Sequence, residues 1–368
     1  MKKTTLIYNV HLIDKNTDCN GALLISGGKI ADILKGDFST PVEAKKLAAK
    51  YAPGAQLYNG NAHTLMPAFV DMHVHLRYPG QTQKEDLHSG LQAAVAGGVG
   101  TVVAMSNTTP VVSSFEMAVK IENEGNALNL ANLFQTVSLT KDFNGADTTH
   151  LDSILSDKVP VVSEDGHDVL DSAVMLEAMQ KTAKKGCIVS CHCEDPSLAS
   201  AARPFRQKAL ELMKKYAIPA WGVNSKGEKN LPPEIDAEIT QNLTKSNELL
   251  AAAEDSCTER NLLLAEIAGC HVHIAHCSTK KSIQAVCRAK LRQKNGGFSV
   301  SCEVTPHHIA LTGTAAPEIR ALVNPPLRSE EDRTALIEAL RDGTADVIST
   351  DHAPHTMDDK ANGSPGFS

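Results

Sequence analysis

The chain has 368 residues, of which 42% are hydrophobic and 21% charged, and 36 basic and 43 acidic side chains give a formal net charge of −7. This composition excludes a disordered chain, a collagen-like repeat and a small disulfide scaffold. The negative charge argues against a general nucleic-acid-binding protein. No run of about 18 apolar residues is present, so no membrane span is expected.

The nine cysteines are spread along the chain. The segment from Met1 to Thr5 has two lysines but lacks the apolar run of a secretory signal peptide. We therefore expect reduced thiols and a cytoplasmic protein. Cys191 and Cys193 flank His192, but in a strand both thiols would point away from the face that carries His192. This alternation argues against a thiolate metal site there.

The first 64 residues predict a small β domain. Residues 5–13 and 22–33 are β-rich, and Gly27-Gly28-Lys29 is typical of a hairpin turn between strands. Residues 42–52 are interpreted as a helix within this domain.

From residue 65 onward, short apolar runs alternate with helical segments. Eight runs are predicted as strands, at residues 68–76, 101–105, 131–139, 159–163, 187–192, 271–276, 298–304 and 346–350. Helical candidates between them include residues 85–96, 169–184, 246–268, 280–291 and 330–341. This alternation predicts an α/β fold with a (β/α)8 TIM barrel over residues 65–368. A doubly wound open sheet is the alternative, but no Gly-x-Gly-x-x-Gly follows a first strand to support it.

One connection is longer than a compact βα unit requires. Residues 196–245 are polar, basic and proline-containing. Long connections of this kind are usually functional or flexible. We interpret the stretch as an excursion over the mouth of the barrel, with at least one helix at residues 206–216.

Histidines and acidic residues gather at the C-terminal ends of the predicted strands, where barrel enzymes place their active sites. The first run ends in His73-Val74-His75, and residues two apart share one face of a strand, so both imidazoles can bind one metal ion. Four other runs end in a further candidate ligand, and these are Asp165, His192, His276 and Asp351. Because an accidental match would have to recur independently at five strand ends, the pattern predicts a metal centre.

These motifs resemble a known family. Residues 66–77, which read Met-Pro-Ala-Phe-Val-Asp-Met-His-Val-His-Leu-Arg, are similar to the metal-binding motif of cyclic amidohydrolases. The continuation Pro79-Gly80-Gln81 and Lys84-Glu85-Asp86 resembles dihydroorotase. Further similar segments follow in the same order, at residues 105–108, 192–195, 275–280, 303–308, 324–328 and 349–355. Together they resemble the class I branch of the dihydroorotase family.

The resemblance implies an enzyme that holds two zinc ions. His73, His75 and Asp351 would bind one ion, and His192 and His276 the other. Related hydantoinases and allantoinases bridge the ions with a carboxylated lysine, whereas some class I dihydroorotases have a Ser-Asp-Asp-Gly motif. Here the motif reads Ser-Glu-Asp-Gly at residues 163–166, so Asp165 is the expected bridging ligand.

Several neighbouring residues are expected to lie off the metal centre. Glu164 would point to the opposite face of its strand from Asp165. Lys158 precedes the strand and is a poor candidate for a carboxylated lysine. His271 and His273 are expected to be structural or solvent-facing, because the family's ligand corresponds to His276.

The implied activity is the reversible hydrolysis of dihydroorotate to N-carbamoyl-aspartate by a metal-bound hydroxide, in de novo pyrimidine biosynthesis. Asp351 would act as the general base that carries the proton to the leaving ring nitrogen. Arg77 can bind the substrate carboxylate with two parallel hydrogen bonds. By resemblance, the substrate-binding residues are His75, Arg77, Asn107, Asn324, His355 and the backbone of Pro365 and Gly366.

The family's sequences continue past the last residue of this chain. The resemblance therefore predicts a fragment or truncated chain whose C-terminal part is missing, with residues 1–64 forming only the N-terminal part of a β-sandwich domain. The missing part would hold the last barrel helix and the returning strands of the β-sandwich. The excursion at residues 196–245 does not resemble the family.

Two alternative functions stay open. The first is another cyclic amidohydrolase, acting on allantoin, hydantoins or dihydropyrimidines, although Arg77 and Asp165 favour a dihydroorotase. The second is a catalytically silent homologue that serves as a partner protein, which the complete set of metal ligands argues against. Beyond the small-molecule substrate, a homodimer or an association with another pyrimidine-pathway enzyme is open, and neither a nucleic acid nor a membrane is expected as a partner.

Overall fold

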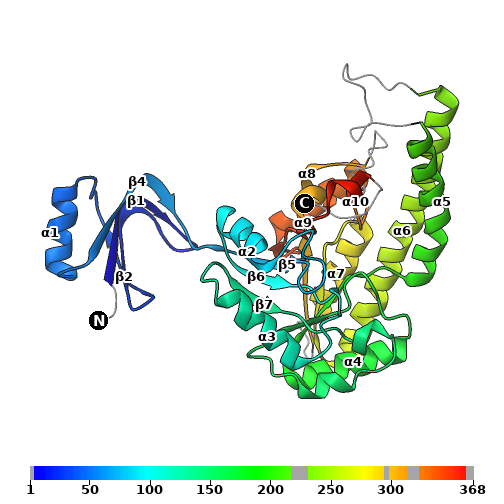
Figure 1. Ribbon diagram of the computed structural model, residues 1–368, viewed down its shortest axis with the longest axis horizontal. Coiled ribbons are helices and arrows are strands. Elements are labelled where there is room, and N and C mark those ends of the chain that lie inside the picture. Colours follow the sequence, from blue (N-terminus) through cyan, green and yellow to red (C-terminus); the bar gives the residue numbers. More distant parts are fainter. Residues whose placement is uncertain (1–3, 217–230, 294–297, 314–322, 362–368) are drawn as a thin grey trace. The chain divides into compact units, whose positions relative to one another are not determined.

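A computed structural model of the protein describes residues 4–216, 231–293, 298–313 and 323–361 (Figure 1). The chain divides into two compact units, Met1–Phe69 and Val70–Ser368. Among the described residues, no helix combines the length and the apolar character that a membrane crossing requires.

The first unit contains one four-stranded sheet, in the order β3-β2-β1-β4. Its strands are β1 (Thr4–Ile13), β2 (Asp18–Ser26), β3 (Lys29–Lys35) and β4 (Gln56–Leu65). Gly27 and Gly28 have φ angles of 60° and 77°, the left-handed conformation that a tight hairpin between β2 and β3 requires. The predicted hairpin is thus confirmed. The sequence prediction omitted β4, whose Gln-Leu-Tyr-Asn-Gly-Asn-Ala-His-Thr-Leu run is too polar to stand out as a strand.

The helix expected at residues 42–52 is α1 (Pro41–Tyr51). The Thr40 side chain accepts a hydrogen bond from the Glu43 backbone, and the Glu43 carboxylate accepts one from the Thr40 backbone. This capping box satisfies backbone groups at the helix start. The helix packs Ala44 and Ala48 into the apolar core of this unit. Residues 4–69 therefore hold one sheet with one helix, and a second layer of strands stays a prediction.

Each of the eight predicted runs of the second unit overlaps a strand. They are β5 (Phe69–Val74), β6 (Val99–Ala104), β7 (Asn132–Gln135), β8 (Val161–Ser163), β9 (Ile188–Cys191), β10 (His271–Ile274), β11 (Ser299–Val304) and β12 (Val347–Ile348). One sheet has the order β5-β6-β7 and the other the order β12-β11-β10-β9-β8. Isolated parallel bridges, Val137 to Val162 and Val74 to His352, join the two sheets at both edges. The strands thus follow one another around a closed ring.

Helices alternate with these strands along the chain (Figure 1). They are α2 (Leu87–Ala96), α3 (Phe115–Asn126), α4 (Ser172–Lys185), α5 (Pro196–Lys215), α6 (Pro233–Ala268), α7 (Lys280–Gln293), α8 (Pro306–Ala310), α9 (Glu330–Asp342) and α10 (Met357–Ala361). Buried Val, Leu, Ile, Ala and Cys side chains of the strands and helices form one continuous core. Burial of this apolar surface is the main force that holds the unit together.

The described part of residues 196–245 is almost wholly helical, and the helix expected at residues 206–216 is confirmed, since α5 spans Pro196–Lys215. Asp195 caps α5 by accepting hydrogen bonds from the backbone of Ser197 and Leu198, and Pro196 occupies the first turn. The helix therefore begins ten residues before the predicted one. It packs beside α6 (Figure 1). Their shared core contains Ala209, Leu212, Met213 and Ile239.

Candidate metal centre and active site

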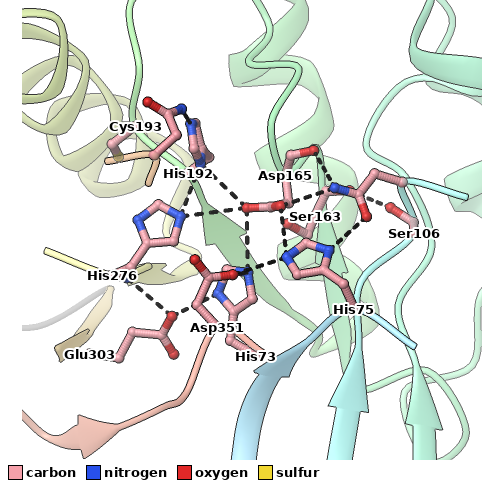
Figure 2. A network of polar contacts seen from close by, with 12 residues as sticks. His73, His75, Ser106, Ser163, Asp165, His192, Cys193, His276, Glu303 and Asp351 are labelled. Atoms are coloured by element: carbon pink, nitrogen blue, oxygen red, sulfur yellow. Dashed lines mark hydrogen bonds and ion pairs between the residues drawn. The ribbon is translucent and has the colours of Figure 1, made fainter. Parts of the chain in front are cut away.

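Asp165 follows β8, and its carboxylate lies among four imidazoles (Figure 2). Oδ1 is 3.5 Å from His73 Nε2, 3.4 Å from His192 Nδ1 and 3.6 Å from His276 Nε2. Oδ2 is 3.5 Å from His75 Nε2. The carboxylate thus faces imidazoles that come from the ends of three different strands, β5, β9 and β10.

Asp351 follows β12 and completes the cluster. Its Oδ1 lies 3.0 Å from His75 Nε2 and 3.6 Å from His73 Nε2. The ends of β5 and β12 are tied together, because the Asp71 carboxylate accepts hydrogen bonds from the backbone and the hydroxyl of Thr350, at 3.1 Å and 2.6 Å. The backbone of Asp351 has a φ of 51°, a conformation that costs energy for this residue and that is common at functional sites.

The ligand atoms form two groups that could each hold a metal ion, His73 with Asp165 and His276, and His73 with His75 and Asp351. Two ligand atoms at about 2.1 Å from one tetrahedral zinc ion lie roughly 3.4 Å apart, close to the separations seen around Asp165. His73 Nε2 and Asp165 Oδ1 are buried and have no hydrogen-bond partner. Buried polar atoms without a partner are rare and costly, so these residues fit a metal ion.

The carboxylate of Glu303 in β11 contacts two of the candidate metal ligands, His73 and His276. Its Oε1 accepts a hydrogen bond of 2.7 Å from His73 Nδ1 and one of 3.1 Å from the backbone N–H of His276, and its Oε2 lies 3.2 Å from His273 Nε2. Burial opposes a charge on His73, but the Asp165 and Glu303 carboxylates outweigh burial and raise its pKa well above the ordinary value. The carboxylates therefore make this buried site favourable for a cation.

Sequence reasoning did not give Glu303 a role. An available signal was a lone acidic residue in the otherwise uncharged run Ser-Val-Ser-Cys-Glu-Val, because a carboxylate in a buried strand needs a partner.

Asn107 and Asn324, expected to bind substrate, both contact metal-ligand candidates. Asn107 Oδ1 accepts a hydrogen bond of 2.8 Å from His75 Nδ1, and its Nδ2 donates to Asp165 Oδ2 at 3.2 Å. Because Nδ1 is engaged by Asn107, Nε2, which lies 3.0 Å from Asp351 Oδ1, is the nitrogen of His75 that could bind a metal ion. Asn324 Nδ2 donates to Glu194 at 3.0 Å and lies 3.3 Å from His192 Nε2.

A cleft of about 380 Å³ opens onto this cluster. Its lining contains all the substrate-binding residues expected from the sequence that the structure describes, namely His75, Arg77, Asn107, Asn324 and His355. It also contains Gln81, Lys84, Gly166, His167 and Ala353, which the sequence analysis did not assign to substrate binding. The volume suits a small-molecule ligand. The expected backbone contacts of Pro365 and Gly366 lie outside the described residues.

Arg77 is held at one side of this cleft. Its Nε donates to the carbonyl oxygen of Pro354 at 3.0 Å, and its Nη2 lies 3.2 Å from His355 Nε2. The side chain is largely buried, so its charge is poorly screened by water. A buried guanidinium beside the ligand cluster is well suited to bind a carboxylate.

Comparisons with known proteins agree with this site. The model of a family described as Dihydro-orotase-like matches residues 62–230. The protein named "Dihydroorotase" of Clostridium botulinum (strain Eklund 17B / Type B) is 34% identical over 364 residues, which cover 98% of this chain and 74% of that protein. The protein of the same name from Lactobacillus johnsonii (strain CNCM I-12250 / La1 / NCC 533) is 36% identical over 369 residues, covering 100% and 73%. The chain belongs to the dihydroorotase family.

Solved structures of cyclic amide hydrolases share its α/β fold. An L-hydantoinase (dihydropyrimidinase) from Arthrobacter aurescens has a TM-score of 0.74 at 18% identity, with 99% of this chain and 72% of that chain covered. A D-hydantoinase (dihydropyrimidinase) from Thermus sp. has a TM-score of 0.67 at 21% identity, with the same coverage. At these identities the likeness describes the fold alone.

Within this dihydroorotase-family chain, Glu164 points away from Asp165. Its carboxylate accepts hydrogen bonds from the backbone and the hydroxyl of Thr140, and burial raises its pKa to about 7. Lys158 lines a separate hollow with Glu122. Both residues thus lie off the ligand cluster, as expected from the sequence.

The other histidines and cysteines near the centre have structural contacts. His273 is buried and lies 2.8 Å from the Ser301 hydroxyl, while His271 is partly buried and lies 3.0 Å from the same hydroxyl. Of the two roles expected for His271 and His273, structural or solvent-facing, these contacts indicate the structural one. Cys193 accepts a hydrogen bond from Asn261, and all nine cysteines are free. Neither group of metal-ligand candidates includes a cysteine of the described chain.

Proposed function

We propose that this protein is a zinc-dependent dihydroorotase that interconverts dihydroorotate and N-carbamoyl-aspartate in pyrimidine synthesis. The observation that carries the proposal is the Asp165 carboxylate among four imidazoles, beside a cleft that also contains Arg77. The family supports a cyclic amide as substrate. The buried guanidinium favours a cyclic amide that carries a carboxylate over hydantoins and dihydropyrimidines that lack one.

The proposal includes the architecture that presents these residues. The closed ring of strand pairs supports a (β/α)8 barrel over residues 65–368, with the ligands at the C-terminal ends of its strands. Residues 1–64 would form the N-terminal part of a β-sandwich domain, of which β1 to β4 make one layer.

The cluster would hold two zinc ions. His73, His75 and Asp351 would hold one ion, and His192 and His276 the other. Asp165 would lie between them, because its two oxygens face different imidazoles. When bound, zinc supplies the positive charge and the acidity that let water attack an unactivated amide near neutral pH.

The protein's own groups would bind the substrate and move the proton. Burial would raise the pKa of Asp351, but the hydrogen bond from His75 and the nearby imidazoles lower it to about 2. Asp351 is therefore ionised, and it can take a proton from the attacking water and pass it to the leaving ring nitrogen. Arg77 and His355 would bind the substrate carboxylate, and Asn324, which also lines the cleft, would orient the ring.

The test is a dihydroorotate hydrolysis assay on zinc-loaded protein, with the metal quantified on the same sample. We expect turnover that scales with bound zinc and stops when a chelator removes it. Allantoin, hydantoin and dihydrouracil serve as competing substrates. Faster hydrolysis of any of these three, or bound zinc without any turnover of dihydroorotate, would contradict the proposal.

A further inference from the structure

Four side chains meet around His355, which lines the cleft beside the ligand cluster. Arg77 and Lys84 come from the loop after β5, and His355 and Asp359 come from the segment after β12. His355 lies between the others, with Nε2 at 3.2 Å from Arg77 Nη2, and Nδ1 at 3.3 Å from Lys84 Nζ and 3.6 Å from Asp359 Oδ2. Lys84 Nζ is itself 3.4 Å from Asp359 Oδ2. The imidazole therefore has a cation at each ring nitrogen and a carboxylate beside one of them.

These partners determine which nitrogen of the His355 ring can carry a proton. Burial, followed by the charges of Arg77 and Lys84, lowers the pKa of His355 to about 4, so the ring is neutral near neutral pH. A neutral imidazole has one N–H and one lone pair. It cannot accept hydrogen bonds from both Arg77 and Lys84 at once. Nδ1 has a suitable partner in both tautomers. When Nδ1 carries the proton, Asp359 can accept a hydrogen bond from it, and when Nδ1 carries the lone pair, Lys84 can donate a hydrogen bond to it.

Among the described residues, the Nε2 side has Arg77 as its hydrogen-bond partner and lacks an acceptor until substrate arrives. In the free protein Nε2 faces the Arg77 guanidinium, which only donates, so Nε2 must hold the lone pair and Nδ1 the proton. A carboxylate bound by Arg77 only accepts, so Nε2 must then carry the proton. The free and bound states therefore require different tautomers of His355.

We propose that Lys84 and Asp359 are positioning residues that allow His355 to change tautomer when the substrate carboxylate binds. The inference rests on the proposed function, because it needs a substrate with a carboxylate. In the free protein Nδ1–H faces Asp359. In the complex Nδ1 gives up that proton to solvent and accepts a hydrogen bond from Lys84, while Nε2 gains a proton from solvent and donates to the substrate. The ring stays neutral, and no net proton is taken up.

The local structure holds both partners in place. The loop after β5 forms successive turns, in which Gln81 N donates to Arg77 O and Lys84 N donates to Gln81 O, each at 2.9 Å. These turns bring Arg77 and Lys84 beside the same imidazole, that of His355. Asp359 Oδ2 accepts a 3.1 Å hydrogen bond from the Thr356 backbone, and Asp359 N donates to Thr356 Oγ1 at 3.1 Å. The Asp359 carboxylate is therefore held in position by Thr356 independently of its contacts with Lys84 and His355.

The kinetic test compares Lys84→Met and Asp359→Asn with two control variants. The controls are Asp358→Asn, which makes the same change one residue away, and Lys281→Met, which removes an exposed lysine. We expect KM for dihydroorotate to rise about 10-fold or more in both test variants, since each loses a hydrogen bond to a charged group. We expect kcat to change much less, and turnover of dihydrouracil, which has no carboxylate, to stay as in the wild type. Asp359→Glu should restore most of the affinity.

Nitrogen-15 NMR of labelled histidine reads the tautomer directly in the zinc-loaded protein. His355→Gln identifies the signals of this ring. We expect the proton on Nδ1 in the free protein, and on Nε2 in the presence of dihydroorotate at equilibrium with N-carbamoyl-aspartate. The same tautomer in both states would overturn the inference, as would a doubly protonated ring in the complex.

The outcomes separate this inference from the proposed function. A wild-type protein that does not turn over dihydroorotate would reject both. A wild-type protein that does, with KM values in Lys84→Met and Asp359→Asn equal to those of the two controls, would reject the inference alone. Metal content and the unfolding temperature of every variant are measured alongside. If Asp359→Asn does not fold, Lys84→Met and the NMR tautomer decide the question.

Discussion

Glu303 Oε1 accepts a hydrogen bond of 2.7 Å from Nδ1 of His73, a residue 230 positions earlier in the chain. Because Nδ1 donates this bond, Nε2 is the nitrogen of the ring that could bind a metal ion, and it faces Asp165 and Asp351. The same carboxylate accepts a bond from the backbone of His276. One buried side chain thus sets the tautomer of one candidate ligand and the position of another.

Removing the charge of Glu303 should weaken metal binding. Glu303→Gln keeps the shape of the side chain but leaves a weaker acceptor for His73, and we expect a loss of roughly 10- to 100-fold in zinc affinity. Competition against a chelator of known affinity measures it. Glu338→Gln, an exposed position on α9, is the control and should bind zinc as the wild type does. Equal affinity in the two variants would refute the role of Glu303.

Asp165 is expected to be the bridging ligand. Asp165→Ala should lose at least one metal ion and nearly all activity, because two neighbouring cations need an anion between them. Glu164→Gln and Lys158→Ala should keep both ions, since those side chains lie off the cluster. Metal analysis of purified protein, with and without bicarbonate during reconstitution, measures this. Metal binding that depends on bicarbonate or on Lys158 would instead indicate a carboxylated lysine.

Arg77 should determine the preference for a carboxylated substrate. Arg77→Lys keeps the charge but loses the planar fork, and we expect a loss of about 1–3 kcal/mol in transition-state binding, seen as a lower kcat/KM for dihydroorotate. Dihydrouracil turnover should hardly change. Wild-type protein that hydrolyses dihydrouracil as well as dihydroorotate would show that this role is wrong.

Gly80 should be needed for the loop that carries Arg77. Its φ is +90°, and an added Cβ would lie 1.8 Å from the carbonyl oxygen of Thr109. Gly80→Ala must therefore displace backbone, and we expect a loss of about 1–3 kcal/mol in stability together with reduced activity. Gly145→Ala is the matched control, because its φ is +70° but its Cβ would meet nothing within 4 Å. Chemical denaturation should show a clearly smaller loss for Gly145→Ala.

His308 should make the fold sensitive to acid. Burial, helped by His307, lowers its pKa well below the usual value, and its ring bonds to Thr305 and to the carbonyl of Pro325. Below about pH 6.5 the unfolded chain gains a proton at this residue that the folded chain does not, so the free energy of unfolding falls as the pH falls. The contribution is at most about 1.4 kcal/mol per pH unit.

The variant His308→Gln should show a shallower loss of stability between pH 7.5 and 5.5. Denaturation is measured in chelator-treated protein, so that release of metal does not contribute to the pH dependence. His88→Gln, at an exposed position, serves as the control. Equal pH dependence in all three proteins would contradict the assignment to His308.

Much of the fold could be predicted because its signals are local. A short apolar run that is buried on both faces, such as the one around Val189 or Val272, predicts a strand wherever it lies in the chain. His73 and His75 share one strand face because side chains alternate with a period of two. The cap at Asp195 and Pro196 is a local signal too, and it places the start of α5 ten residues before the predicted helix at residues 206–216.

Only the tertiary structure decided which side chains meet. Asp165 lies among imidazoles from three strands because ring closure brings those strand ends together, and no local pattern encodes that spacing. The contacts of Asn107 with His75, and of Lys84 and Asp359 with His355, likewise join residues far apart in the sequence. Periodicity and capping depend on a few neighbouring residues, whereas a distance across the cleft depends on the packing of the whole unit. The sequence by itself therefore determined the candidate ligands and the order of the strands, while their arrangement around one carboxylate required the fold.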